Sequence, residues 1–172
     1  TYVTSVARTE FAPCPPAPSI RPPERDIPMP QAPRPADHPM KRFDISGSEI
    51  DRIVTLFYIR VRTHPELGPV FARYVQDGDW PAHEAKIARF WRNAILREKS
   101  YSGNPMRVHV TRPEIEAHHF PQWLGLFHQV LKAELPAEIA LQWGALADRI
   151  GEGFRTGIVA MRQPKDAPPK LF

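Results

Sequence analysis

Three histidines lie where an imidazole would meet a flat apolar surface. His83 falls in an aromatic segment, 80–91, and His109 ends a stretch in which a turn sequence leads into a short apolar and basic segment. His119 opens a further aromatic segment downstream. Imidazole nitrogens coordinate metals and exchange hydrogen bonds near neutral pH. We interpret these segments as two walls and the rim of one flat, apolar pocket with an imidazole on each side.

Such a pocket suits haem, a flat apolar disc with two anionic propionates. Haem needs an imidazole for the iron, a helix over its other face and cations at the mouth of the pocket. Donors aimed at a dioxygen ligand stabilise its partial negative charge, as in charge-assisted hydrogen bonds. Tyr58, His83 and Trp123 are the candidate donors, because each is expected on or beside the apolar stripe of a different helix. Lys86 and Arg107 flank the two histidines and are expected to contact the propionates.

The first helix that must position these residues is predicted by a capping box at its start and an apolar stripe along its length. Ser46 and Glu49 form a capping box, and the helix is expected to run to about residue 62. Tyr58 lies beside its apolar stripe, where a tyrosine usually packs with its hydroxyl satisfied. The stripe itself recurs at helical spacing and comprises Ile50, Ile53, Val54, Phe57 and Val61.

A second long helix is expected from Trp80 to about residue 97. Asp79 can cap it, and Pro81 falls in the first turn, where proline is tolerated. A lone histidine on an apolar face is usually a hydrogen-bonded core residue, but the second candidate histidine downstream weakens that interpretation. The buried face carries His83, Ile87, Phe90, Trp91 and Ala94.

The segment around His109 cannot hold itself in place. Residues 106–110 are too few for an independently stable helix, so His109 owes its position to something that it binds or packs on. Thr111 and Glu114 form a second capping box, which predicts that the next helix begins there. Pro121 should kink or restart that helix.

The remaining elements are helical as well. A short turn of helix is expected from residue 67 to about 75, and a last helix from about 137 to 161. No β pattern appears, so we predict an all-α domain of five or six helices.

Composition divides the chain of 172 residues into three parts. Eleven of the 21 prolines fall between residues 11 and 39, so we expect a disordered, proline-rich extension over 1–42. A docking arm and a solvated leader are the two interpretations of it, and we favour the leader. The folded domain is expected over 43–162, followed by a flexible tail over 163–172.

The net charge, the cysteine count and the lengths of the apolar runs limit which classes of function are expected. The net charge is +4, but residues 1–42 hold six basic and four acidic residues, so +2 lies there, and the later basic residues form no run. A nucleic-acid partner is therefore not expected. Cys14 is the single cysteine, which excludes an internal disulfide and indicates a reducing cytoplasm. No apolar run reaches the roughly 18 residues of a membrane span, and the start lacks the pattern of a secretory signal.

Taken in order, the motifs resemble the group III truncated haemoglobins of bacteria over residues 43–162. Each piece alone is unspecific, whereas the ordered set is highly specific. The set comprises Phe57-Tyr58, Leu67-Gly-Pro-Val-Phe71, Asp79-Trp80-x-x-His83, Phe90-Trp91, Tyr101-x-Gly-Asn-Pro105, His109 and His119-Phe120-x-x-Trp123-Leu-x-Leu-Phe127.

That resemblance implies a shortened globin, a two-over-two helical sandwich around haem b. His109 matches the proximal iron ligand, and Tyr58, His83 and Trp123 match the distal tyrosine, histidine and tryptophan. Members of the family are discussed as oxygen-reactive, peroxidase-like or nitric-oxide-handling proteins. Further positions match the lining of the haem pocket, namely Phe57, Ile87, Phe90 and Trp91.

We therefore predict a cytoplasmic haem protein for oxygen binding or transport, or for binding another diatomic ligand. Its iron is pentacoordinate or weakly hexacoordinate, depending on whether His83 ligates it. The alternative is a peroxidase-like or nitric-oxide-detoxifying enzyme that needs a reductase partner. Two other interpretations are a helical interaction module with core histidines and a zinc site of His83, His109 and His118 or His119. No usual zinc-ligand spacing supports the zinc site.

Overall fold

The computed structural model describes residues 41–163, which form α-helices, one short 3-10 helix and no strand. This confirms the all-α prediction for the described part of the chain. The predictions for residues 1–40 and 164–172 lie outside the described residues. The elements in order are α1 (Gly47–Thr63), α2 (Leu67–Ala72), η1 (Asp77–Asp79), α3 (Trp80–Leu96), α4 (Pro105–Val110), α5 (His119–Glu134) and α6 (Ala137–Met161).

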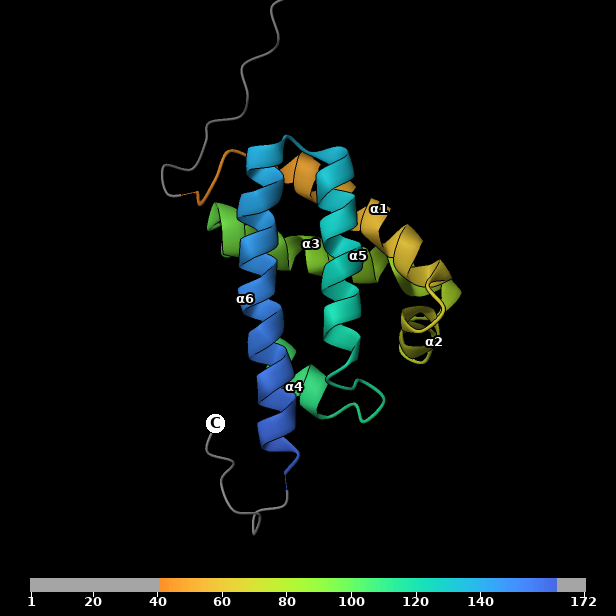
Figure 1. Cartoon of the computed structure of the whole chain (residues 1–172). Helices are drawn as coiled ribbons and strands as arrows, with labels where there is room; N and C mark the ends of the chain where they lie inside the picture. Colours follow the sequence, from red (N-terminus) through yellow and green to blue (C-terminus); the bar gives the residue numbers. More distant parts are fainter. Residues whose placement is uncertain (1–40, 164–172) are drawn as a thin grey trace, which may run out of the picture. The chain divides into compact units, whose positions relative to one another are not determined.

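The four long helices form two layers. In Figure 1, α5 and α6 run side by side, and α1 and α3 cross behind them. α1 packs against both α3 and α5, which joins the two layers, while the short α4 packs against α6. This is the two-over-two sandwich that was predicted.

Local chemistry sets the start and end of α1. The Ser46 side chain accepts the Glu49 backbone N–H at 3.2 Å, and the Glu49 carboxylate accepts the Ser46 backbone N–H at 2.8 Å. The predicted capping box is therefore present. The helix stops at His64, whose backbone is extended because the next residue is Pro65.

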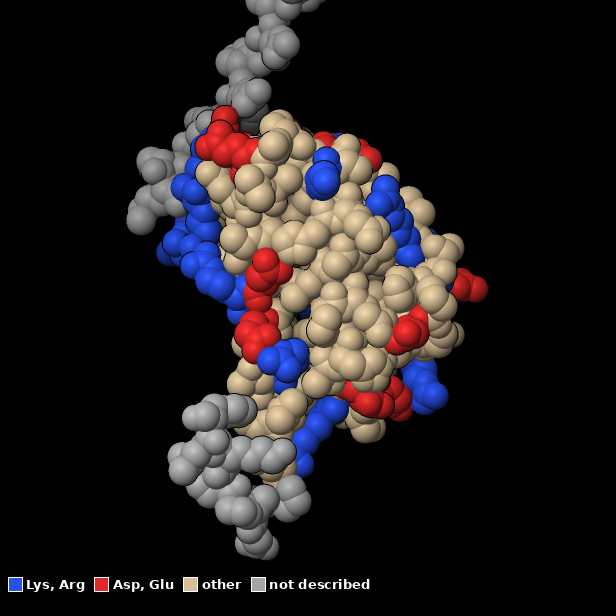
Figure 2. Space-filling view, in the orientation of Figure 1, with Lys and Arg blue, Asp and Glu red and all other residues tan. Residues whose placement is uncertain are grey.

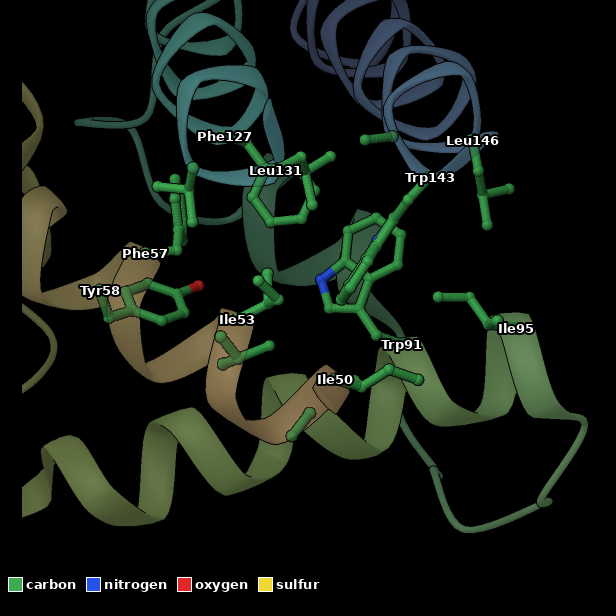
Figure 3. Packing of buried hydrophobic residues seen from close by; sticks show 14 of the residues in the cluster. Ile50, Ile53, Phe57, Tyr58, Trp91, Ile95, Phe127, Leu131, Trp143 and Leu146 are labelled. Carbon is green, nitrogen blue, oxygen red and sulfur yellow. The ribbon is translucent and has the colours of Figure 1, made fainter. Parts of the chain in front are cut away.

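An aromatic cluster fills the space between the layers. Phe127 of α5 is fully buried, stacks on Trp91 with centroids 5.5 Å apart, and meets Trp143 and Phe57 edge-on at 5.6 and 5.1 Å. Figure 3 shows these rings converging from α1, α3, α5 and α6. This packing fixes the relative positions of the helices that carry the candidate site.

One predicted helix start is wrong. α5 begins at His119, and residues 111–118 form turns instead of a helix. The Thr111 hydroxyl donates back to the Arg107 carbonyl at 2.9 Å, so it closes the end of α4. Glu114 accepts a hydrogen bond from Tyr74, so its carboxylate is not used as a cap.

The surface of the α5–α6 layer carries few charges. In Figure 2, Lys and Arg lie mainly around the margins of this face, interspersed with Asp and Glu. None of the helices within residues 41–163 is long and apolar enough to cross a membrane.

Candidate functional site

A cavity of about 250 Å³ is lined by residues from α1, α2, α3, α4, α5 and α6. That volume is many times the roughly 10–15 Å³ that one water molecule needs. Most of the lining side chains are aromatic or aliphatic, and none of the lining residues is Asp or Glu. The cavity therefore suits a large, apolar ligand that carries negative charge at its edge.

His109 reaches this cavity from α4, near the end of that helix. Asn104 caps α4 by accepting the Arg107 backbone N–H at 2.9 Å. His109 Nδ1 lies 2.7 Å from the Pro105 carbonyl oxygen. A carbonyl only accepts, so Nδ1 carries the proton and the Nε2 lone pair is free, which is the form that ligates a metal.

Two aromatic rings set the orientation of the His109 ring. Phe154 of α6 stacks on it with centroids 4.7 Å apart, and Phe120 of α5 lies tilted against it at 5.5 Å. Burial lowers the pKa of His109, and the nearby Arg112 and Arg162 act in the same direction against the Pro105 hydrogen bond. The imidazole is therefore neutral at pH 7.

His83 lies on α3 inside a cage of aromatic rings. Its ring meets Tyr58, Phe71 and Trp80 edge-on, with centroids 4.9, 5.9 and 5.8 Å away. Its Nε2 is buried and has no hydrogen-bond partner. Burial, reinforced by the charge of Lys86, lowers the pKa of His83 to about 4. A neutral imidazole with an unused buried nitrogen is costly to keep unless it has a ligand to bind.

Tyr58 and Trp123 bring two further polar groups to the cavity lining. Tyr58 is only 2% exposed, and burial together with the charge of Glu84 raises the pKa of its hydroxyl well above the ordinary value. The Trp123 side chain opposes this rise as a hydrogen-bonding neighbour. Phe57 meets Trp123 edge-on at 4.8 Å, so the indole is held from behind.

Cations line the cavity at two places. Lys86 is exposed on α3, and Arg112 is half-buried just after α4. The Arg112 guanidinium lies 4.0 Å from the centre of the Tyr74 ring. The Tyr74 hydroxyl donates to Glu114 and holds the pKa of that carboxyl below its usual range. These contacts join the segment after α2 to the turns after α4.

Comparisons with known proteins show which family the chain belongs to. No protein-family model matches it. It is 35% identical over 94 residues to a group 3 truncated hemoglobin of Campylobacter jejuni, a match that covers 54% of this chain and 74% of that protein. A crystal structure of a group III truncated hemoglobin from the same species aligns with a TM-score of 0.66 and 29% identity, over 73% of this chain and all of that one.

The chain belongs to the group III truncated haemoglobins. The motif resemblance found in the sequence is thereby confirmed, and so is the truncated-globin fold.

Most of the predicted site residues of this truncated haemoglobin lie around one cavity. Phe57 and Arg107 do not line it: Phe57 packs behind Trp123, and the Arg107 side chain is exposed on α4. The predicted residues that do line it are Tyr58, His83, Lys86, Ile87, Phe90, Trp91, His109 and Trp123.

Sequence reasoning missed several residues of the cavity. Phe154 was not among the predicted site residues, although its ring stacks on that of His109. Arg112 and Tyr74 were not singled out, because neither belongs to a motif or an apolar stripe. The sequence held one local signal for Arg112, which lies within three residues of His109, as Arg107 does. It held none for Tyr74.

The zinc alternative has no matching geometry in the described residues. No group of three His, Cys, Asp or Glu side chains gathers there in a way that could hold a metal ion.

Proposed function

We propose that this truncated haemoglobin binds haem b in the cavity, with His109 as the axial ligand, and handles dioxygen or another diatomic ligand. The observation that carries the proposal is the pair of histidines. Both line one apolar cavity from different helices, one with a free Nε2 lone pair and one with a buried, unpartnered Nε2.

The residues present fit a haem in three respects. The cavity walls are apolar, its charged lining residues are cations, and a correctly protonated imidazole is available for an iron. When bound, haem supplies an iron with an axial position for a small ligand. Its propionates would meet Lys86 and Arg112, which replace the expected pair of Lys86 and Arg107 because Arg107 does not line the cavity.

His109 has the partner that an axial histidine requires. The Pro105 carbonyl accepts its Nδ1–H, which fixes the ring orientation and raises the basicity of Nε2. The stacked Phe154 ring limits rotation of the imidazole. This residue holds a neutral nitrogen at a fixed place in the cavity.

Tyr58, Trp123 and His83 would stabilise the diatomic ligand. The raised pKa keeps the Tyr58 hydroxyl protonated, and the Trp123 indole N–H is a donor only. Neutral His83 carries one N–H and one lone pair, so it can donate to a ligand or coordinate the iron. Together they would provide donors to the partial negative charge of the ligand.

A second candidate is peroxidase-like activity, which the state of His83 favours. A neutral imidazole with a free buried nitrogen can take a proton from a peroxide and return it to the departing oxygen. Nitric oxide detoxification would use the same donors and would need a reductase partner.

Haem titration of the apoprotein tests the proposal. We expect a strong Soret band that saturates at one haem per chain, and a ferrous form that binds carbon monoxide as a probe diatomic ligand. Absence of a saturating Soret band would overturn the proposal of haem binding.

Hydrogen peroxide then separates the two candidate functions. Turnover of peroxide that His83→Ala abolishes supports the enzyme, and no turnover supports ligand binding alone.

A further inference from the structure

Arg162 makes four hydrogen bonds to the backbone around His109. Its Nη2 donates to the carbonyls of His109 and Arg112, both at 2.6 Å. Its Nη1 donates to the Ile115 carbonyl at 2.7 Å, and its Nε to the Val110 carbonyl at 3.2 Å. The residue caps the end of α6 and is more than 45 positions away in sequence from each of these partners.

These carbonyls belong to a segment that lacks support of its own. α4 has six residues, and none of them is fully buried. The last carbonyls of a helix have no partner within it. Arg162 donates to the last two carbonyls of α4, those of His109 and Val110, and to two carbonyls of the turns that follow, those of Arg112 and Ile115. Its guanidinium is one rigid, planar group that a lysine cannot imitate.

The last turns of α6 hold α4 in two further ways. Phe154 stacks on the His109 ring, and Gly157 allows Met106 of α4 to pack directly on the α6 backbone. A methyl group at Gly157 would come within 2.4 Å of the Met106 Cε. The ring, the helix and the carbonyls around His109 are thus all fixed from one stretch of α6.

We propose that Arg162 is a positioning residue that sets where the His109 imidazole lies in the cavity, and so tunes the axial bond of the proposed haem. This inference rests on the proposed function. It goes beyond that function because it places control of His109 in the C-cap residue of α6, which does not itself line the cavity.

Two variants separate hydrogen-bond geometry from charge. Arg162→Lys keeps the positive charge but loses the planar guanidinium, and Arg162→Met keeps an unbranched apolar stem but loses both the charge and the guanidinium. Arg155→Met is the matched control, because Arg155 lies on α6 and, within residues 41–163, pairs with Glu152 of the same helix and not with α4.

Hydrogen exchange of the apoprotein is the first readout. We expect amides in residues 105–115 to exchange about tenfold faster in Arg162→Lys and Arg162→Met, with no change in α1 or α3 and none in Arg155→Met. Unchanged exchange in Arg162→Lys would overturn the proposal. This readout needs no haem and stands even if the cofactor assignment fails, which a missing Soret band in the parent protein would reveal.

The second readout is the iron–histidine stretching band of the ferrous haem-loaded protein. We expect it to shift or broaden in both Arg162 variants and to match the parent in Arg155→Met. A band identical to the parent in Arg162→Lys, alongside faster exchange, would show that Arg162 stabilises the backbone without positioning the imidazole. If Arg162→Met does not fold, Arg162→Lys alone decides the result.

Discussion

The two walls of the cavity differ in what holds their side chains. The distal wall comprises Tyr58, His83 and Trp123, and its rings pack into the aromatic cluster of the core. The proximal wall is formed by His109, which is supported by Phe154 of α6 and by Arg162 at the C-cap of α6. It depends on two ring contacts with His109, from Phe154 and Phe120, and on a set of hydrogen bonds to the backbone.

This difference separates the consequences of mutation. A change deep in the distal wall should alter the stability of the whole domain, because the same rings hold the helices together. A change in the proximal wall should alter the His109 position while the core remains intact.

Phe127→Ala should destabilise the apoprotein by about 3–5 kcal/mol, the usual cost of removing a fully buried phenylalanine. Phe154→Ala should reduce stability markedly less than Phe127→Ala, because Phe154 is only partly buried. Relative to its loss of stability, however, Phe154→Ala should weaken haem retention more than Phe127→Ala does. Urea unfolding of both apoproteins and haem transfer to an acceptor protein measure the two effects. Equal losses of stability in Phe127→Ala and Phe154→Ala would contradict the proposed difference between the two walls.

Tyr58→Phe should leave haem uptake intact and speed release of dioxygen. Loss of one buried donor should cost about 1–3 kcal/mol, or roughly 5–150-fold in rate. Stopped-flow release of dioxygen measures it. Tyr101→Phe is the control, because Tyr101 also lines the cavity but lies edge-on to Phe90 in a loop. Equal rates in both variants and the parent would exclude Tyr58 as a ligand donor.

Acid should destabilise the apoprotein partly through His83. Its pKa in the folded state is about 4, against 6.5 for an exposed histidine. The unfolded chain therefore binds the proton first, and stability is lost as the pH falls from about 6.5 to about 4. His83→Phe should reduce this loss. Some loss should persist, because burial lowers the pKa of His109 and His119 as well.

Urea unfolding at pH 7, 6, 5 and 4 measures this dependence. A loss of stability in His83→Phe as large as in the parent would contradict the assigned state of His83.

Tyr74→Phe should have the smallest effect. It removes the hydroxyl that joins the segment after α2 to Glu114, and this contact lies at the surface. Haem loss should rise by less than about fivefold, as is typical of exposed polar contacts. A much larger increase in the haem-loss rate would mean that this contact, which joins the segment after α2 to the turns after α4, controls haem retention.

The distal wall was predictable from the sequence because local rules govern it. The apolar spacing of α1 and α3 placed Tyr58 and His83 on or beside buried faces, and the capping box at Ser46 fixed the start of α1. Periodicity and capping act over a few residues, so they remain visible in a linear sequence.

The supports of the proximal wall were not predictable in this way. His109 was recognisable, but Arg162 reaches its carbonyl from 53 residues away, and no local pattern encodes that contact. The second capping box failed for a related reason: Glu114 is used by Tyr74, which lies 40 residues earlier. Proximity in sequence was a poor guide to the cations too, since Arg112 lines the cavity and Arg107 does not.

The most direct test of the account is replacement of His109 by glycine in the haem-loaded protein, followed by addition of free imidazole. We expect His109→Gly to lose the parent's ferrous spectrum and to regain it when imidazole occupies the vacated place. His128→Gly should keep the parent's spectrum, because His128 pairs with Asp148 away from the cavity. A His109→Gly spectrum identical to that of the parent would show that another residue holds the iron.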